Sequence, residues 1–532
     1  MTVGLILAAV VMLCCVFFNK VSDKIGLPAL LAFILLGMLF GSDGIFKIPF
    51  DNYKIAENVC SAALIVIIFY GGFGTKWSAA KKVAGKSILL SSAGVIMTAG
   101  LVGLFCHYIL NFSMKECFLI GAVISSTDAA SVFSVLKTKK LNLKFSTASI
   151  LELESGSNDP WAYMLTIIML SVMRGKSTPA EFAKMLFSQI FFGILFGVLI
   201  SAAALLIIKH IKFNAAGFDS IFFSAAALLS YALPTLVNGN GYLSAYIVGI
   251  VLGNSKIPDK KSLVHFFDGI TVFMQILLFF LLGILSFPSQ IPKIILPAAA
   301  IMIFLTFIAR PLSVFTLMKP FKAPLNQIAL ISFAGLRGAT SIVFAIIVTV
   351  DDAYTKNDIF HIVFLIVLLS IGIQGTLLPF ISKKLNMIDD SENVMKTFND
   401  YSDETEVNFI KLCIDKDSDW AYKEIRDITL PPGLLIVMIL RNGKKIIPDG
   451  NTQMIADDIL ILSAKGFYDD NTFILSEVSI NKNNKWCGKP LSEISMGEDN
   501  LIVMIRRGDK TLIPNGQIKI EENDILVMTS NI

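Results

Sequence analysis

Ionisable side chains are rare within the long apolar segments of this 532-residue chain, and most of them gather in three short stretches. An ionisable group inside a membrane-spanning segment costs about 2.5 to 3.5 kcal/mol on insertion scales, so it is a candidate for function. Carboxylates there can carry protons or bind cations, and guanidinium groups can pair with them. The ionisable residues expected well inside the segments are Asp128, Glu152, Glu154, Asp159, Arg310 and Arg337.

The first stretch, residues 125–131, reads Ser-Ser-Thr-Asp-Ala-Ala-Ser and contains Asp128. Its four hydroxyl side chains and one carboxylate compete with a helix for backbone hydrogen bonds. We therefore predict a locally opened helix that exposes carbonyl oxygens to a cation. Secondary transporters build ion sites from such broken helices near the middle of the membrane.

The second stretch, residues 151–161, reads Leu-Glu-Leu-Glu-Ser-Gly-Ser-Asn-Asp-Pro-Trp. In a helix, Ser155 and Asp159 share one face, and Glu154 and Asn158 share the adjacent one. The oxygen atoms of these side chains include a titratable carboxylate. They suit a hard monovalent cation that must compete with a proton.

Pro160 follows Asp159 and has no N–H group, so the carbonyl of Gly156 loses its helical partner and can face a polar cavity. Burial favours the protonated form of a carboxyl group, whereas a bound cation favours the ionised form. Asp159 is therefore predicted to alternate between carrying a proton and carrying a cation.

The third stretch, residues 334–341, reads Ala-Gly-Leu-Arg-Gly-Ala-Thr-Ser. A buried guanidinium group needs an acidic partner or carbonyl oxygens. We expect Arg337 to pair with Glu154, which leaves Asp128 and Asp159 for the ion. The alternative interpretation of the three stretches is a polar network that only packs helices together, and for Arg337 a structural role is favoured.

The two remaining ionisable residues are expected at the edges of the site. Arg310 precedes Pro311 near the end of an apolar segment, so it is expected to be an interfacial anchor. Glu152 is expected at the mouth of the cavity.

Thirteen apolar segments, separated by short polar loops, must position these residues. About 20 apolar residues cross a bilayer core, so we predict thirteen transmembrane helices. The fifth and twelfth run in opposite directions and both carry a polar break, as an inverted repeat requires. The segments are 2–18, 27–41, 56–73, 87–112, 116–136, 147–172, 186–208, 218–236, 240–254, 263–287, 294–318, 325–350 and 359–381.

The charges of the loops indicate the orientation of the chain. Cytoplasmic loops carry an excess of Lys and Arg, and an outside N-terminus places 19 of these residues inside against 8 outside. With an odd number of spans, the C-terminal tail then lies in the cytoplasm. The first segment lacks the basic start and cleavage site of a secretory signal, so it is expected to be a retained span.

The composition excludes several classes of protein. Only 16% of the residues are charged, which is too few for one large soluble enzyme. The charges are concentrated in residues 385–532, where 25 Asp or Glu outnumber 16 Lys or Arg. No basic surface points to nucleic acid, and the seven cysteines and four histidines have no metal-ligand spacing.

The tail contains an internal repeat with an offset of 66 residues. Residues 420–463 and 486–529 share 16 of 44 aligned positions, which indicates a duplicated domain. Each copy predicts strands joined by polar turns and resembles the TrkA-C domain, also called RCK-C, of potassium-conductance regulators. The resemblance implies regulation by a small ligand within residues 405–532, for which cyclic di-AMP is a family-based guess. A dimerisation or scaffold module without a ligand is the alternative. No G-x-G-x-x-G motif supports NAD binding.

The membrane part resembles the monovalent cation/proton antiporter family, CPA1 branch, and in particular its bacterial potassium/proton antiporters. The resemblance implies a homodimer that exchanges one cation for one proton. It also implies that the ion is bound by Asp159, Asp128, Ser155 and the Thr127 main chain, and that Asn158, Glu154 and Arg337 hold the crossing helices. The motifs that carry it are DKIGLP at 23–28, LGMLFG at 36–41, STDAAS at 126–131, ESGSNDP at 154–160 and GLRGA at 335–339.

One position departs from the family pattern. Relatives usually have an acidic residue before the Gly-Gly of the third segment, and this chain has Tyr70 there, followed by Gly71 and Gly72. Any contribution that the acidic residue of relatives makes to ion access or selectivity is therefore not expected from Tyr70.

We predict a polytopic α-helical membrane protein with the inverted-repeat antiporter fold at 1–384, a linker at 385–404, and two cytoplasmic α+β RCK-C-like domains at 405–466 and 467–532. It is predicted to be a bacterial inner-membrane antiporter rather than an enzyme, to need no cofactor, and to exchange K⁺ for H⁺ by alternating access. Exchange of Na⁺ is the first alternative. A ligand-gated potassium channel is another, although no TVGYG-like filter occurs, and a receptor with a structural polar core is the third.

Overall fold

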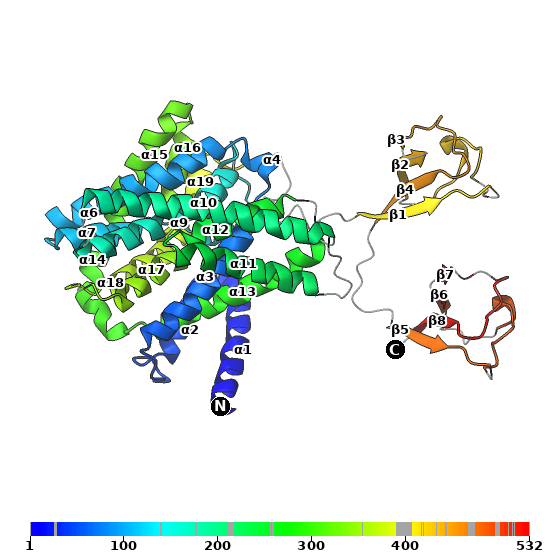
Figure 1. Cartoon of the computed structure of the whole chain (residues 1–532), viewed down its shortest axis with the longest axis horizontal. Coiled ribbons are helices and arrows are strands. Elements are labelled where there is room, and N and C mark those ends of the chain that lie inside the picture. Colours follow the sequence, from blue (N-terminus) through cyan, green and yellow to red (C-terminus); the bar gives the residue numbers. More distant parts are fainter. Residues whose placement is uncertain are drawn as a thin grey trace. The chain divides into compact units, whose positions relative to one another are not determined.

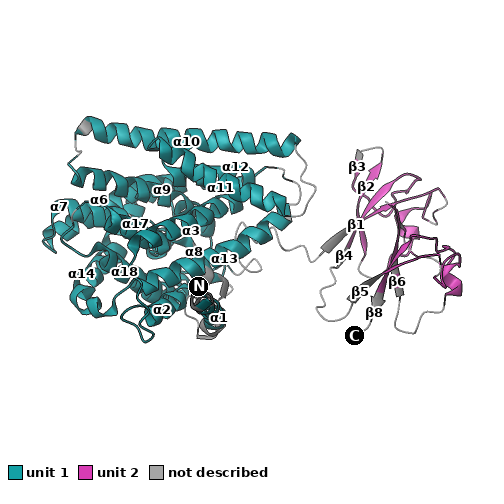
Figure 2. Cartoon of the chain, turned by 60° about the horizontal axis from the view of Figure 1, so that its bottom comes forward, with its two compact units in different colours: residues 1–403 teal, residues 404–532 magenta. Residues whose placement is uncertain are grey.

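The computed structural model contains two compact units, Met1–Asp403 and Glu404–Ile532 (Figure 2). The predicted linker at 385–404 lies largely outside the described residues, as do the boundary at 466–467 and part of the DKIGLP motif. The structure describes residues 2–25, 29–138, 141–175, 178–210, 217–255, 257, 260–353, 355–389, 407–416, 418, 420–431, 434–441, 444–465, 474–482, 484–494, 501–508, 510–512, 514 and 516–530.

Unit 1 is helical throughout its described part (Figure 1), and each of the thirteen predicted segments coincides with one helix or with consecutive helices. Among the described residues, seven helical stretches are long and apolar enough to cross a membrane, and four shorter apolar helices accompany them. The helices are α1 (Thr2–Ile25), α2 (Ala29–Phe40), α3 (Tyr53–Gly74), α4 (Trp77–Ala80), α5 (Ala84–Leu89), α6 (Val95–Tyr108), α7 (Met114–Val123), α8 (Ala129–Thr138), α9 (Thr147–Met173), α10 (Pro179–His210), α11 (Phe218–Leu236), α12 (Gly241–Gly253), α13 (Lys260–Ile284), α14 (Ile291–Phe304), α15 (Arg310–Met318), α16 (Leu325–Phe333), α17 (Ala339–Val350), α18 (Ile359–Leu369) and α19 (Thr376–Lys384).

Several predicted spans are interrupted, and the interruptions occur in matching places of the two halves. The fifth span is broken between α7 and α8, and the twelfth between α16 and α17, which confirms both predicted breaks. The fourth and eleventh spans each contain one π-helical segment, at Leu90–Gly94 and Leu305–Ala309. Because the equivalent spans are seven apart, this pattern is that of an inverted repeat. A third π-helical segment, Ser370–Gly375, joins α18 to α19.

The helices of unit 1 form two groups. We call α2, α3 and α10–α13 the scaffold, since α3 packs on α12, α2 on α13 and α10 on α12. We call α5–α9 and α14–α19 the bundle, since α6 packs on α7, α7 on α9, and α14 and α17 on α18. The groups meet where α3 contacts α17 and where α12 contacts α9.

Glycines allow the scaffold helices to approach each other closely. A Cβ atom on Gly283 of α13 would overlap the backbone of α2 at Ile34 and Gly37, and one on Gly249 of α12 would overlap the backbone of α3. Larger residues would force these helix pairs apart. Sites of this kind are typical of helix pairs in membranes, where small residues let backbones touch.

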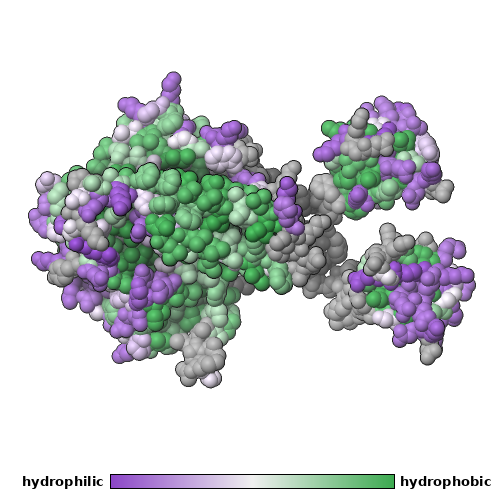
Figure 3. All heavy atoms as spheres, in the orientation of Figure 1, coloured by the Kyte–Doolittle hydropathy of each residue, from purple (hydrophilic) through white to green (hydrophobic). Residues whose placement is uncertain are grey.

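A broad part of the face of unit 1 seen in Figure 3 is apolar. Along α10, Phe187, Phe191, Val198 and Leu199 are between 45% and 65% exposed. A soluble protein rarely leaves so many large apolar side chains in contact with water. The exposed apolar side chains are those expected of helices in contact with lipid.

Unit 2 contains two four-stranded antiparallel sheets of identical topology. Their strand orders are β1-β4-β2-β3 and β5-β8-β6-β7. Both sheets have a register shift at the same place, between Ile436 and Met438 and between Ile502 and Met504. The strands are β1 (Val407–Cys413), β2 (Leu435–Arg441), β3 (Lys444–Ile446), β4 (Ile459–Lys465), β5 (Ile474–Ser479), β6 (Leu501–Arg507), β7 (Lys510–Leu512) and β8 (Ile525–Ser530).

The duplication extends to a buried ion pair. In the first copy, the Arg441 guanidinium donates two hydrogen bonds of 2.8 Å to the Asp458 carboxylate. In the second copy, Arg507 donates two bonds of the same length to Asp524. Both aspartates are fully buried. The 66-residue sequence repeat is therefore a structural repeat, which includes both the strand topology and the ion pair.

Candidate ion-binding site

Two unwound segments cross in the bundle. Residues 124–128 separate α7 from α8, and residues 334–338 separate α16 from α17. The N–H of Asp128 donates a 2.8 Å hydrogen bond to the carbonyl of Leu336, so the segments are joined directly. Gly338 is required at the crossing, because a Cβ atom there would overlap the Asp128 side chain.

Asp128 also caps the start of α8. Its carboxylate accepts hydrogen bonds from the Ser131 N–H at 3.3 Å and from the Ser131 hydroxyl at 2.5 Å. A carboxylate at this position satisfies a free backbone donor and interacts favourably with the positive end of the helix. The helix break thus positions a carboxylate beside the crossing.

Asp159 of α9 faces the crossing and lies between the two breaks. Its Oδ1 accepts a short hydrogen bond from the hydroxyl of Ser126, in the first break. Its Oδ2 accepts a 3.2 Å bond from the hydroxyl of Thr340, which follows the second break. Asp159 is 9% exposed. Hydroxyl groups can rotate. When a cation displaces the hydrogen bonds to Asp159, the hydroxyl oxygens can therefore turn toward the cation and bind it.

Ser155 and Asn158 connect α9 to the first break. The Ser155 hydroxyl donates to the Thr127 carbonyl at 2.6 Å and accepts from the Ala129 N–H at 2.9 Å. The Asn158 amide donates to the Thr127 hydroxyl at 2.6 Å. The two bonds of Ser155 satisfy backbone groups that the opened helix leaves free, and the bond of Asn158 fixes the Thr127 side chain. The structure therefore brings together Asp159, Asp128, Ser155 and Thr127, which were expected to bind the ion, and Asn158, which was expected to hold the crossing helices at the same site.

The predicted pairing of Glu154 with Arg337 is wrong. Glu154 pairs instead with Arg310, whose guanidinium donates to the Glu154 carboxylate at 2.5 Å, and both side chains are less than 5% exposed. The assignment of Arg310 to the membrane interface is wrong for the same reason. The π-helical segment at Leu305–Ala309 directly precedes Arg310 and belongs to a span whose middle lies inside the bundle. Position in the sequence alone did not reveal that depth.

Arg337 donates its hydrogen bonds to carbonyl oxygens, the second kind of partner that a buried guanidinium can have. Its Nη1 donates to the carbonyls of Ser125 at 2.8 Å and Ser126 at 2.6 Å, and its own N–H donates to the Ser370 hydroxyl at 3.0 Å. Arg337 is 1% exposed. It therefore holds the two unwound segments together from the side of the second break.

One acidic residue of the scaffold was not among the residues predicted from the sequence. Asp268 of α13 accepts a 2.5 Å hydrogen bond from the Tyr70 hydroxyl of α3. It lies within the predicted segment 263–287, so the search for ionisable residues in apolar segments could have found it. Tyr70, which stands on α3 where relatives usually have an acid, thus contacts the acid Asp268 on the neighbouring helix. Glu152, expected at the cavity mouth, is partly exposed on α9.

Comparison with known proteins identifies the family. The family described as "Sodium/hydrogen exchanger, transmembrane" matches residues 6–384, which is more than half of the chain. The chain belongs to the sodium/hydrogen exchanger family. The TrkA-C domain family matches residues 412–466 and 475–532, one match for each sheet of unit 2. This membership makes the chain a transporter rather than an enzyme, with ions as substrates.

Curated members of this exchanger family cover nearly the whole chain. The K(+)/H(+) antiporter NhaP of Alkalimonas amylolytica is 30% identical over 482 residues, which are 89% of this chain and 83% of the relative. The K(+)/H(+) antiporter NhaP2 of Shewanella sp. (strain ANA-3) is 32% identical over 531 residues, covering 98% and 80%. The sodium proton antiporter MjNhaP1 of Methanocaldococcus jannaschii has a similar fold, with a TM-score of 0.62 at 23% identity over 72% of this chain and 99% of that chain.

Proposed function

We propose that this exchanger exchanges K⁺ for H⁺ across a bacterial inner membrane, with Na⁺ as the alternative cation. The preference for K⁺ is supported by the names of the relatives that match over most of the chain. The structural relative is a sodium antiporter, which supports Na⁺ as the alternative. K⁺ and Na⁺ differ in coordination distance, and rotatable hydroxyl ligands suit either ion.

The observation that carries the proposal is the position of the Asp159 carboxylate. It lies at the crossing of two broken helices, and within the described part of the chain it accepts hydrogen bonds from the hydroxyls of Ser126 and Thr340. Asp128, in contrast, is held by the start of α8. Asp159 is therefore the carboxylate that can exchange its hydrogen bonds for a cation or a proton without unfolding a helix end.

The exchange follows from competition at this one carboxylate. A proton and a monovalent cation each neutralise Asp159. The bundle therefore has the same net charge with either one bound when it moves between its two positions. Exchange of one cation for one proton is then electroneutral. Alternating access requires the bundle to move against the scaffold between two positions, a rigid-body change of the kind found in other transporters.

The test is proton flux in everted membrane vesicles, followed with a pH-sensitive dye. After respiration acidifies the lumen, addition of K⁺ to vesicles with the wild-type chain should release protons, and Asp159→Asn should abolish this release. Thr166→Val is the matched control, because Thr166 is buried on the same helix and, among the described residues, its hydroxyl bonds to the Ala162 carbonyl one turn away. Cation-dependent proton release that survives in a well-folded Asp159→Asn protein would contradict the mechanism.

We further propose that unit 2 lies in the cytoplasm, with the N-terminus outside, and that it regulates exchange. The excess of Lys and Arg in one set of loops supports this orientation. The TrkA-C matches favour a regulatory ligand within residues 405–532, with cyclic di-AMP as the first compound to test. The division at 384, 404 and 466 and the assembly into homodimers are parts of the same proposal.

A further inference from the structure

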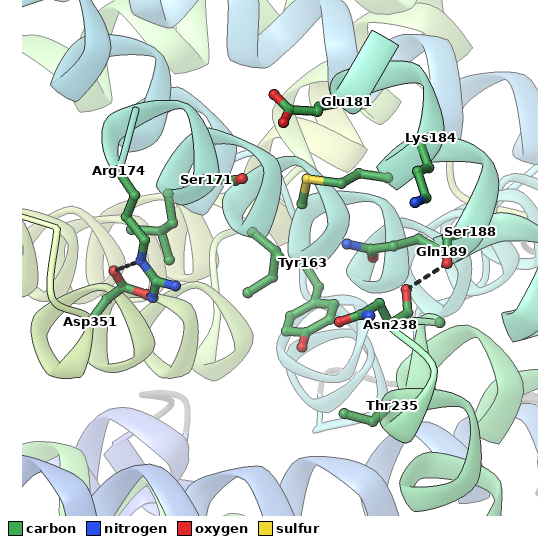
Figure 4. A pocket seen from close by; sticks show the side chains of 14 residues that line it. Tyr163, Ser171, Arg174, Glu181, Lys184, Ser188, Gln189, Thr235, Asn238 and Asp351 are labelled. Atoms are coloured by element: carbon green, nitrogen blue, oxygen red, sulfur yellow. Dashed lines mark hydrogen bonds and ion pairs between the residues drawn. The ribbon is translucent and has the colours of Figure 1, made fainter. Parts of the chain in front are cut away.

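An open cavity of about 460 Å³ lies between the bundle and the scaffold at one end of the membrane part (Figure 4). Its wall is formed by the C-terminal ends of α9, α11 and α17 and the N-terminal end of α10. With the N-terminus outside, this end faces the exterior. The charged residues of its wall are Arg174, Glu181, Lys184 and Asp351, two of each sign.

Tyr163 lines this cavity on the side of the ion site. In Figure 4 its ring lies between the Arg174–Asp351 ion pair and the side chain of Gln189. Tyr163 stands one helical turn from Asp159 on α9, so both side chains project from the same face of the helix. A cation that entered the cavity would therefore meet Tyr163 before it reached Asp159.

Behind Tyr163, aromatic rings fill the space between the two groups of helices. The Tyr163 ring contacts that of Tyr242 edge to face, with centroids 4.9 Å apart, and lies 5.8 Å from that of Phe344. Tyr231 adds a further ring 4.8 Å from Tyr242. Tyr242 and Phe344 are fully buried. Rings in contact at these distances leave no space between them for a water molecule or a cation.

The rings belong to both moving parts. Tyr163 is on α9 and Phe344 on α17, both in the bundle, whereas Tyr231 and Tyr242 are on the scaffold helices α11 and α12. The contact between Tyr163 and Tyr242 must therefore change whenever the bundle moves against the scaffold. A contact that blocks the path in one position and separates in the other is a gate.

We infer that Tyr163 and Tyr242 form the outer gate of this exchanger, a pair of rings that separates the outer cavity from the ion site at Asp159. The inference rests on the proposed antiport, and it assigns the two tyrosines a steric role, in which their rings act and their hydroxyls do not. Removal of one ring should open a water-filled path from the outer cavity to Asp159, so that the carboxylate can be reached from outside also while it is accessible from inside. Protons then cross without a cation.

The test uses the full-length protein reconstituted in proteoliposomes with an imposed pH gradient and only an impermeant organic cation present. Tyr163→Ala and Tyr242→Ala should collapse the gradient several-fold faster than wild type. Tyr163→Phe and Tyr242→Phe keep the rings, so they should leak no more than wild type. Tyr163→Ala combined with Asp159→Asn should lose the added leak, because the open path runs through the carboxylate.

A second variant and a separate readout keep the outcomes distinct. Tyr242→Leu retains apolar volume if the alanine variants do not fold, and it should also leak. Alanine and leucine variants with wild-type leak, or phenylalanine variants that leak as much as the alanine variants, would overturn the gate. Potassium-driven exchange by wild type is measured in the same liposomes, so failure of the proposed antiport would appear there and not in the leak.

Discussion

Glu154 and Arg310 form an ion pair that is buried inside the bundle. Burial of an isolated carboxylate is strongly unfavourable, and breaking a buried ion pair by removing one partner costs about 3 to 5 kcal/mol. Because Arg337 bonds to carbonyl oxygens instead, the two arginines have separate structural roles. The coupling of Glu154 to each arginine can be measured separately.

We predict that Glu154→Gln and Arg310→Met each lower the melting temperature of the purified protein, whereas the double variant recovers most of the loss. The coupling energy should be about 0.5 to 3 kcal/mol, the range for residues in direct contact. The corresponding cycle of Glu154→Gln with Arg337→Met is the control and should be closer to additive. Equal coupling in both cycles would show that the pair in the structure is not the one that stabilises the bundle.

At the scale of elements, the interface between α9 and α12 is closely fitted on both sides of Asp159. On the side of the cavity Tyr242 contacts Tyr163, and on the other side Tyr246 covers Gly156. Between them, the Asn240 amide donates a 2.8 Å hydrogen bond to the Pro160 carbonyl. Any relative movement of the two helices must break this set of contacts together.

Gly156→Ala should therefore block exchange. The added Cβ atom would lie 2.8 Å from Cε2 and 2.9 Å from the hydroxyl of Tyr246, closer than side chains can approach. Gly100→Ala on α6 is the matched control, because no atom lies within 4 Å of its added Cβ, and it should leave exchange intact and gain about 0.5 to 1 kcal/mol of stability. Vesicle assays and melting temperatures report both effects.

Restoration of exchange by Tyr246→Ala in the Gly156→Ala background would identify the clash as the cause. If the double variant stayed inactive while Tyr246→Ala alone was active, Gly156 would be required for a reason other than the space that Tyr246 occupies.

At the scale of the whole molecule, the two TrkA-C units repeat one stabilising ion pair. Burial alone would raise the pKa of Asp458, but the hydrogen bonds from Arg441 and from the Ile455 N–H, together with the Arg441 charge, lower it below its ordinary value of 3.8. The pKa of Asp524 is lowered in the same way by Arg507 and the Glu521 N–H. The native state thus holds these protons less tightly than the unfolded state, so the stabilisation is complete above pH 4 and is lost as the pH falls further.

Asp458→Asn should destabilise the first sheet, and Asp524→Asn the second, by about 1.5 to 3 kcal/mol each at neutral pH. Hydrogen exchange of the full-length protein, followed by mass spectrometry, should show faster exchange in β4 for the first variant and in β8 for the second. Each variant serves as the control for the other. Loss of protection in both sheets from a single substitution would show that the units unfold together.

Much of the architecture could be predicted from the sequence because it depends on local composition. Apolar runs long enough for a bilayer, polar breaks in two of them and a 66-residue repeat predicted the helices, the breaks between α7 and α8 and between α16 and α17, and the duplicated β units. The same residues also nominated Asp159 and Asp128, since a carboxylate in an apolar run is conspicuous wherever it lies.

The partners of those residues were decided only by the tertiary structure. Which arginine reaches Glu154 depends on the depth of Arg310 in its span, and which helix supplies an acid to Tyr70 depends on the packing of α13 against α3. The aromatic contact between Tyr163 and Tyr242 joins residues 79 positions apart through two helices that meet side by side. Composition reveals that a group is buried, but which groups meet depends on the packing of helices distant in sequence.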